Sequence, residues 1–334
     1  MKAVQTETTG SIEALRLTDL PEPQAGPGEV LIRVEAAAVN FMDLMRVKGL
    51  PFDVPTPLPF VPGAEVSGTV VALGEGVESL EVGARVFGAS GQLLNGGWAE
   101  LTTARAAGLA PIPAGMAAEQ AAGLTVAGAG AAIALIEAAR TAPGETVFVP
   151  AAGGGFGGYA VQIAKALGAT VIAGAGTPQK RQVALDLGAD HAVDYRTPGW
   201  TEAITELTGG TGADVVLEGL GPQHVGESLS ILAPFGRVVV YGVLPGYGKI
   251  VDVDALAALV NDPSQAKSVT GFNVTHWLTH RPQASLTAVG RLLGWIADGT
   301  VTGPRITSLP LAEAAHALTL LERGENTGKT VLIP

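Results

Sequence analysis

The spacing of hydrophobic residues in the first third of the chain is that of short strands. Apolar runs separated by Gly and Pro predict strands at residues 30–34, 65–72, 85–89 and 97–102. Runs at this spacing are typical of a compact, mainly antiparallel, barrel-like domain. The proline-rich loop at residues 51–62 is interpreted as a rigid connector or as the rim of a pocket.

Beyond about residue 117 the pattern changes to alternating helices and strands. A helical pattern at residues 117–140, interrupted by glycines, leads into a strand at 145–150. Further strands at 170–174, 191–194, 214–218 and 237–241 alternate with helices at 179–187, 201–208 and 223–232. This rhythm predicts a doubly wound parallel sheet that binds its ligand at the carboxyl ends of the strands.

The last part of the chain predicts a return to the first domain. Past residues 268–272 the chain carries helical patterns at 282–298 and 310–321 and a final strand at 330–333. The sequence therefore predicts an α/β protein of two domains. Residues 1–122 and 273–334 form the mainly β domain, and residues 123–272 form the domain with the parallel sheet.

One glycine-rich stretch joins the first strand of the parallel sheet to the next helix. Residues 147–168 have the pattern of strand, tight turn and helix, in which Ala152, Gly154 and Gly157 fit the dinucleotide fingerprint with Ala in the first glycine position. Glycines let the backbone approach a pyrophosphate, and amides at a helix N-terminus favour its negative charge. We therefore predict that this turn, including Gly155 and Phe156, binds a dinucleotide.

The end of the second strand indicates which dinucleotide is preferred. A fold that prefers NAD usually places Asp or Glu here, on the 2′-hydroxyl of the adenosine ribose. Residues 174–181 contain no acid and two cations, Lys180 and Arg181. Lys180 or Arg181, with the Thr177 hydroxyl, would bind a 2′-phosphate. The alternative is that these cations lie on a solvated helix start, and we favour NADP(H).

Composition and charge exclude several classes of protein. Of the 334 residues 47% are hydrophobic and 15% charged, as in a packed protein of two domains. No apolar span reaches the ~18 residues of a membrane helix, and the N-terminus lacks the layout of a signal peptide, so we expect a cytoplasmic protein. The chain has no cysteine, which excludes disulfides and thiolate ligands. Its net charge of −11 disfavours nucleic acid as a partner.

Five segments of the chain together have the pattern of a known family: AAAVNFMDL at 36–44, FVPGAEVSG at 60–68, AAGGGFG at 151–157, LGADHAVDYR at 187–196 and GKTVL at 328–332. Through these segments the sequence resembles the medium-chain dehydrogenase/reductase superfamily, and within it the zinc-free quinone oxidoreductase group related to zeta-crystallin. The resemblance covers essentially the whole chain. It implies a GroES-like catalytic domain and a Rossmann domain with a cleft between them, usually in a homodimer.

The resemblance also implies a set of cofactor-binding residues. Asn40 and Thr125 are expected near the nicotinamide, and Lys180 and Tyr195 at the 2′-phosphate. The remaining cofactor path is expected to involve Gly174, Gly219, Tyr241, Gly242, Val243 and Phe272. For Asn40 and Thr125 the alternative to a catalytic role is a structural hydrogen bond. For Tyr195 the alternative is a core aromatic at a strand end.

The same comparison bears on the metal and the reaction. Zinc-dependent members ligate the catalytic metal with a Cys and a His, and the matching positions here hold Asn40 and Ala64. Glu65 alone cannot build a zinc site, so we expect no metal. The leading hypothesis is an NADPH-dependent reductase of a quinone or an α,β-unsaturated carbonyl. Asn40, Thr125 or a water would stabilise the charge on the acceptor oxygen.

Two alternatives for the function stay open. Tyrosines that often follow the Asn-Phe-x-Asp segment are replaced by Met45 and Pro51, which favours water as the proton donor. Residues 271–278 resemble a segment of enoyl thioester reductases, for which Arg46 and Lys48 would offer a cationic entrance. The other alternative is a protein that binds NADPH with little turnover. His276 and His280 lie four residues apart, but no third metal ligand is evident.

Overall fold

The computed structural model describes all residues except 222–223, 243–253, 255–256 and 258–264. The chain forms two compact units, one made of Met1–Val126 and Arg305–Pro334 and the other of Ala127–Pro304. Within the described residues, no helix combines the length and apolar character needed to cross a membrane.

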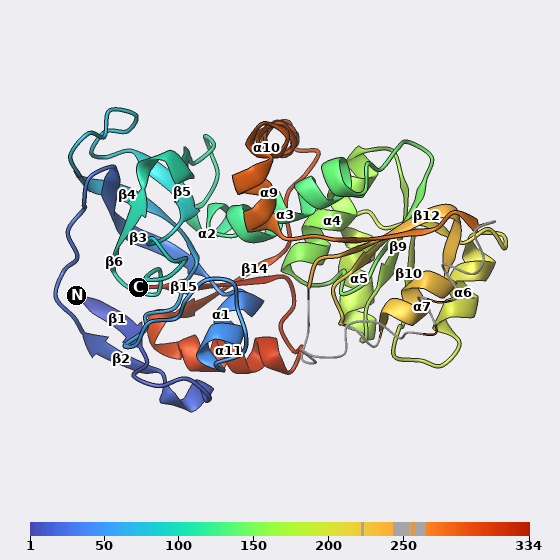
Figure 1. The fold of residues 1–334 in the computed structure, drawn as a ribbon, viewed down its shortest axis with the longest axis horizontal. Helices are drawn as coiled ribbons and strands as arrows, with labels where there is room; N and C mark the ends of the chain where they lie inside the picture. Colours follow the sequence, from blue (N-terminus) through green and yellow to red (C-terminus); the bar gives the residue numbers. More distant parts are fainter. Residues whose placement is uncertain (222–223, 243–253, 255–256, 258–264) are drawn as a thin grey trace. The chain divides into compact units, whose positions relative to one another are not determined.

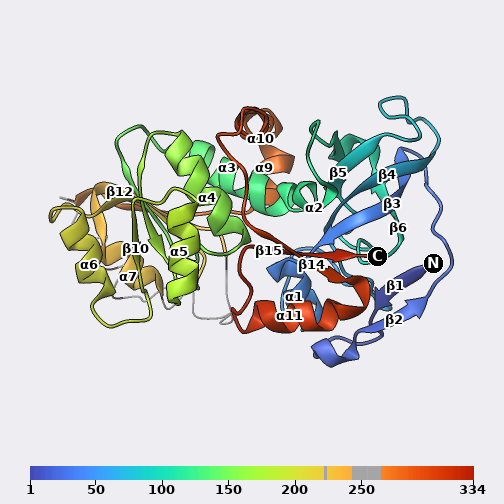
Figure 2. The same cartoon turned by 180° about the vertical axis from the view of Figure 1, so that it is seen from behind.

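The first unit is a mainly antiparallel β structure. Its larger sheet has the strand order β14-β15-β3-β4-β5-β7, with β6 paired to β3, and β1 and β2 form a separate pair. The strands are β1 (Lys2–Gln5), β2 (Arg16–Asp19), β3 (Glu29–Ala38), β4 (Glu65–Leu73), β5 (Arg85–Ala89), β6 (Leu101–Arg105), β7 (Leu109–Pro111), β14 (Ile306–Pro310) and β15 (Lys329–Ile333). The helices are α1 (Phe41–Val47), α2 (Ala118–Ala121) and α11 (Ala314–Glu322). Figure 2 shows β15 returning beside β3 and α11 beside α1.

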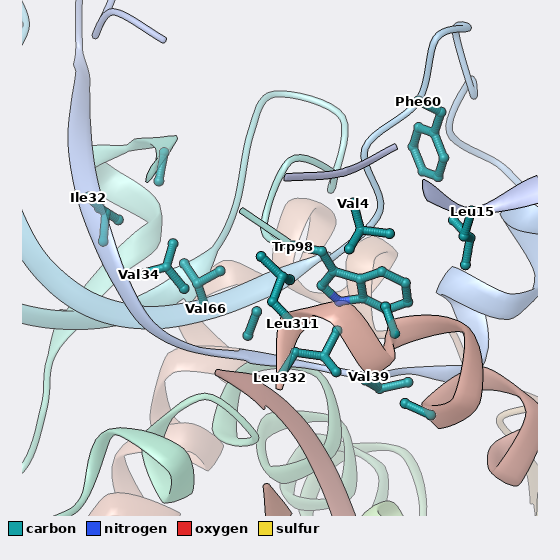
Figure 3. Packing of buried hydrophobic residues seen from close by; sticks show 14 of the residues in the cluster. Val4, Leu15, Ile32, Val34, Val39, Phe60, Val66, Trp98, Leu311 and Leu332 are labelled. Atoms are coloured by element: carbon teal, nitrogen blue, oxygen red, sulfur yellow. The ribbon is translucent and has the colours of Figure 1, made fainter. Parts of the chain in front are cut away.

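A buried tryptophan organises the core of this unit. The Trp98 side chain is fully buried near Val4 and Leu332, as Figure 3 shows, and its Nε1 donates to the Ala38 carbonyl at 3.1 Å. Gly63 has a φ of 97°, and a Cβ there would lie 2.5 Å from Trp98 Cδ1. Only glycine suits this position. The turn therefore passes close to the indole and delivers Glu65 to the start of β4.

The second unit is a Rossmann-type fold. Its six-stranded parallel sheet has the order β10-β9-β8-β11-β12-β13 among the described residues, which is the doubly wound order with β8 first. The strands are β8 (Thr146–Val149), β9 (Thr170–Gly174), β10 (His191–Val193), β11 (Ala213–Glu218), β12 (Leu232–Val240) and β13 (Ser268–Gly271). The helices are α3 (Ala129–Ile133), α4 (Gly155–Ala166), α5 (Pro178–Asp186), α6 (Trp200–Leu207), α7 (Val225–Ser230), α9 (Val274–His280) and α10 (Pro282–Ala297). In Figure 1, α4 to α7 flank these strands.

These observations confirm the expected fold class, but the start of one strand and one boundary between the units differ from the prediction. The strand expected at 97–102 begins only at Leu101, because Gly97 and Trp98 form backbone hydrogen bonds with the turn at residues 62–63. The second boundary between the units lies after Pro304 rather than after residue 272. The reason is that α10 packs against α3, so both tail helices α9 and α10 stay with the parallel sheet.

Candidate functional site

The glycine-rich turn between β8 and α4 is held by close backbone contacts. Ala151 adopts a φ of 50°, and its carbonyl accepts from the Gly154 amide at 2.9 Å. A Cβ at Gly157 would lie 2.4 Å from that carbonyl oxygen, so the first turn of α4 fits only if this residue is glycine. The first amides of α4 thus follow a tight, glycine-rich turn. This geometry suits a pyrophosphate at the helix N-terminus.

The second strand and its helix pack directly on this turn. The Ala152 amide donates to the Gly174 carbonyl at 3.0 Å, and a Cβ at Gly153 would lie 2.8 Å from the Lys180 Cβ. Thr177 is the N-cap of α5 and its hydroxyl accepts from the Lys180 amide at 3.2 Å. The structure therefore brings Ala152, Gly174 and Lys180 together at the turn that is predicted to bind the pyrophosphate.

The two cations at the start of α5 differ in their surroundings. The Arg181 guanidinium donates to Asp194 at 2.6 Å and to the Ala175 carbonyl at 3.2 Å, so its charge is balanced by an acid. The Cβ of Lys180 packs on Gly153 of the turn. This position beside the glycine-rich turn favours Lys180 over Arg181 as the cation for a 2′-phosphate. The residues alone left the choice between them open, and the family resemblance implied Lys180.

Arg196 is a cation at this strand end that the sequence analysis did not select. A Cβ on Gly176 would lie 2.3 Å from Arg196 Nε and 2.7 Å from its Cζ, so the guanidinium lies directly on the loop after β9. Tyr195 lies beside Gly174, with its Cδ1 3.1 Å from a Cβ placed there. Burial raises the pKa of Tyr195, and the neighbouring Arg196 opposes this. The feature of the sequence that could have identified Arg196 is the Tyr-Arg pair that follows β10.

The remaining predicted cofactor residues form an aromatic group over glycines. Phe156 stacks on Tyr241 with ring centroids 3.9 Å apart and planes 13° apart. A Cβ at Gly219 would lie 2.3 Å from Tyr241 Cζ, and one at Gly242 would lie 3.3 Å from the Gly219 carbonyl oxygen. These four residues are therefore brought together, whereas Val243 lies outside the described residues.

Two further residues near this group have structural partners. Phe272 stacks on Trp277 of α9 at 6.4 Å, so its ring is engaged with that helix. Glu218 is buried and accepts from the amides of Leu220 and Gly221 and from the Ser228 hydroxyl, at 2.6, 3.1 and 2.6 Å. Glu218 thus fixes the loop that begins at Gly219.

In the first unit, Asn40 starts α1 and leads to a buried carboxyl group. The Asp43 carboxylate accepts from the backbone amide of Asn40 at 2.9 Å and from the backbone amide of Gly63 at 3.1 Å. Burial raises the pKa of Asp43 to about 6, although the backbone donors and nearby Lys329 and Arg46 oppose the shift. Asp43 therefore joins the start of α1 to the turn before Glu65.

A buried ion pair lies next to the Asn40 side chain. Lys329 Nζ lies 3.0 Å from Glu65 Oε1 and also donates to Asn40 Oδ1. Asn40 Nδ2 donates to the same Glu65 Oε1 at 3.0 Å. The other oxygen, Glu65 Oε2, accepts from the Val126 amide at 2.7 Å, and Thr125 precedes Val126 in a π-helical turn, η3 (Leu124–Gly128). Such turns are frequent at functional sites.

This arrangement does not fit a zinc ion. Both oxygens of Glu65 have hydrogen-bond donors, and an ammonium already supplies the positive charge beside them. Among the described residues there is no group of three or more His, Cys, Asp or Glu side chains that could hold a metal. His276 and His280 do approach each other, with ring centroids 5.6 Å apart, without a third ligand in the described chain.

The cationic entrance expected from Arg46 and Lys48 is wrong for Arg46. Its guanidinium is buried and donates to Thr56 Oγ1 at 3.1 Å and to the carbonyls of Pro55, Leu93 and Leu94. It also lies 4.4 Å from the centroid of the Phe60 ring. Arg46 therefore ties together two loops, and Lys48 forms a salt bridge with Glu322.

Comparisons with known proteins agree with this architecture. Residues 26–114 match the alcohol dehydrogenase GroES-like domain, and residues 155–283 match the zinc-binding dehydrogenase family. A quinone oxidoreductase of Escherichia coli, solved in complex with NADPH, is 30% identical with a TM-score of 0.90, and the match covers 100% of both chains. The CurK enoyl reductase is 27% identical with a TM-score of 0.86, covering 99% of this chain and 98% of that one.

A curated relative is much longer than this chain. The phthioceranic/hydroxyphthioceranic acid synthase of Mycobacterium bovis is 33% identical over 329 residues, which is 98% of this chain and 15% of the synthase. The chain therefore spans a small part of that relative. Together with the two domain matches and the end-to-end likeness to the E. coli enzyme, the Rossmann sheet and its glycine turn show that the chain belongs to the medium-chain dehydrogenase/reductase superfamily.

Proposed function

We propose that the protein is an NADPH-dependent reductase that transfers hydride to a quinone or an α,β-unsaturated carbonyl compound without a metal ion. The observation that carries the proposal is the buried Asn40 amide, held by Glu65 at 3.0 Å and by Lys329. Where zinc-dependent relatives would polarise an oxygen with a metal, this chain offers an amide N–H.

The chain's own residues supply the cofactor site. The turn at residues 151–157 and the first amides of α4 would hold the pyrophosphate, and Thr177, Lys180, Tyr195 and Arg196 would hold the 2′-phosphate. Bound NADPH would supply a hydride from its nicotinamide ring. The NADPH complex of the E. coli quinone oxidoreductase supports this assignment, because the two chains match over their full lengths.

Reduction of such an acceptor places negative charge on its oxygen. The Asn40 N–H donates to that oxygen, and the Thr125 hydroxyl is a second donor on the half-buried turn before Val126. A fixed donor stabilises the developing charge without reorganisation. Met45 and Pro51 carry no acidic proton, so water supplies the proton that completes the reduction.

The second candidate is an enoyl thioester reductase. Its support is the likeness to the CurK enoyl reductase and the match to part of a long acid synthase. The buried position of Arg46 removes one of the two cations expected to receive a phosphopantetheine arm. The quinone or enone reductase is therefore preferred.

The test is NADPH consumption by the purified protein, with NADH in parallel. The acceptors are 1,4-benzoquinone, 9,10-phenanthrenequinone, an alkenal and crotonyl-CoA. Turnover of the quinones or the alkenal with preference for NADPH is the expected result. Turnover of crotonyl-CoA alone would favour the thioester reductase, and tight NADPH binding without turnover would favour a binding protein.

We extend the proposal to a homodimer. Among the described residues, strand β13 lies at the edge of the parallel sheet, where it pairs with β12, and its four residues are exposed. An exposed strand edge is a template for pairing with another strand. Sedimentation velocity should give twice the mass of the 33.7 kDa chain, and a monomer would contradict this extension.

A further inference from the structure

Three side chains that lie far apart in the sequence meet at the start of α1. Asn40 comes from the N-cap of α1, Glu65 from the start of β4 and Lys329 from the start of β15. We propose that Glu65 and Lys329 are positioning residues that fix the direction of the Asn40 amide and so aim its second N–H at the acceptor. This inference rests on the proposed function and names the groups that set its donor.

Charge determines which way the amide points. An asparagine side chain has one accepting oxygen and one donating nitrogen, whereas an ammonium only donates and a carboxylate only accepts. With Oδ1 toward Lys329 and Nδ2 toward Glu65, both contacts are satisfied. Turning the amide over would set its NH₂ against the ammonium and its oxygen against the carboxylate. The pair therefore allows one direction only.

Burial makes this selection strong. The Lys329 and Glu65 side chains are 5% and 0% exposed, so water does not screen them. The lysine stem is confined as well, because a Cβ on Gly123 would lie 3.2 Å from Lys329 Cγ. Neither charged group can easily move away from the amide that it orients.

One hydrogen of the Asn40 side chain is left for a ligand. Nδ2 carries two hydrogens, one of which goes to Glu65, and the described residues supply no acceptor for the other. Glu65 Oε2 also holds the Val126 amide at 2.7 Å, which ties the turn that carries Thr125 to the same carboxylate. The two proposed donors thus share a single support.

The test replaces Glu65 and Lys329 by uncharged residues, first in the wild type and then in an Asn40→Ala variant. Glu65→Gln/Lys329→Met removes both charges together, which avoids an unpaired buried ion. The new glutamine side chain can pair with Asn40 in either direction, so the amide loses its fixed aim. The expected result is a fall in kcat of about 30-fold, with the KM for NADPH changed by less than about 2-fold.

The same double change in an Asn40→Ala background separates positioning from a general structural effect. The expected further loss in kcat is less than about 3-fold, because the amide being positioned is already absent. Equal losses in the two backgrounds would overturn the inference. The exposed pair Lys2 and Asp19, 2.6 Å apart, gives the matched control Lys2→Met/Asp19→Asn, which should leave kcat unchanged.

A spectroscopic measurement decides the matter even if no acceptor is turned over or the double variant does not fold. The chain has five asparagines, so selective ¹⁵N-asparagine labelling gives few side-chain signals, and Asn40→Ala assigns the relevant pair. One Asn40 amide proton should be shifted downfield and protected from solvent exchange by Glu65. Two rapidly exchanging protons near random-coil shifts in the wild type would refute positioning. Absent turnover with a protected proton would count against the proposed function alone.

Discussion

Two regions of the molecule are built in different ways. One is the glycine turn before α4, and the other is the cluster of Asn40, Glu65 and Lys329. The turn is made of backbone, and its demands are steric, as the 2.4 Å contact expected at Gly157 shows. The cluster is made of buried polar side chains whose charges must balance. The comparison teaches that the turn tolerates changes of charge but not of size. The stability of the cluster, by contrast, tolerates paired changes of charge but not single ones.

The largest effect is expected for Lys329→Met. This change leaves the buried Glu65 without its counter-ion, and breaking a buried pair typically costs about 3–5 kcal/mol. Urea unfolding followed by circular dichroism should show this loss, and the paired change Glu65→Gln/Lys329→Met should recover most of it. Lys2→Met, at an exposed ion pair, should leave the midpoint in place. If Lys329→Met and the paired variant were equally unstable, charge balance would not be what governs the cluster.

The same contrast explains what the sequence could predict. The glycine turn is local: its residues fall within one strand-turn-helix segment, and the fingerprint with its flanking βαβ pattern sufficed to find it. Most strands of the parallel sheet were found for the same reason, and the strand at residues 170–174 has the bounds expected. Arg196 escaped because its role depends on how the loop after β10 folds back onto Gly176.

The cluster could not be predicted from the sequence in this way. Lys329 is separated from Asn40 by 289 residues and from Glu65 by 264, and no local spacing links them. Lys329 entered the sequence analysis only within the GKTVL segment of a family resemblance. The helix Pro282–Ala297 was likewise found in place, but its packing on α3, and hence its unit, depended on tertiary contacts.

The next effect concerns pH and again separates the two regions. Burial raises the pKa of Asp43 to about 6, so the folded state binds the proton more tightly than the unfolded state. The contribution of protonated Asp43 to the free energy of unfolding is fully present below about pH 4. It is lost as the pH rises through about 6, which lowers that free energy by about 3 kcal/mol. The unfolding free energy of the wild type minus that of Asp43→Asn should fall over this range. A flat or rising difference would show that burial does not control this carboxyl group.

An effect of about 100-fold on NADPH affinity is expected at the glycine turn. Gly157→Ala forces a Cβ to 2.4 Å from the Ala151 carbonyl oxygen, whereas Gly154→Ala meets the same oxygen at 3.2 Å. Calorimetric titration should therefore show a much larger loss for Gly157→Ala. Equal losses would mean that obstruction of the ligand, rather than packing of α4 on the turn, dominates. Neither loss should vary between about pH 5 and 8, since no titrating side chain forms the contact.

The smallest effect tests where charge does enter the cofactor site. Lys180→Ala should weaken NADPH binding by about 10- to 30-fold and leave NADH nearly unchanged, because only NADPH carries the 2′-phosphate. Arg196→Ala should act in the same direction and more weakly, since its guanidinium lies on the adjacent loop at Gly176. Arg181→Ala is the matched control: its charge is already paired with Asp194 at 2.6 Å, so both cofactors should be affected alike. If Arg181→Ala were the variant that lost NADPH selectively, the ion pair with Asp194 would have to open on binding, and the assignment of Lys180 would fall.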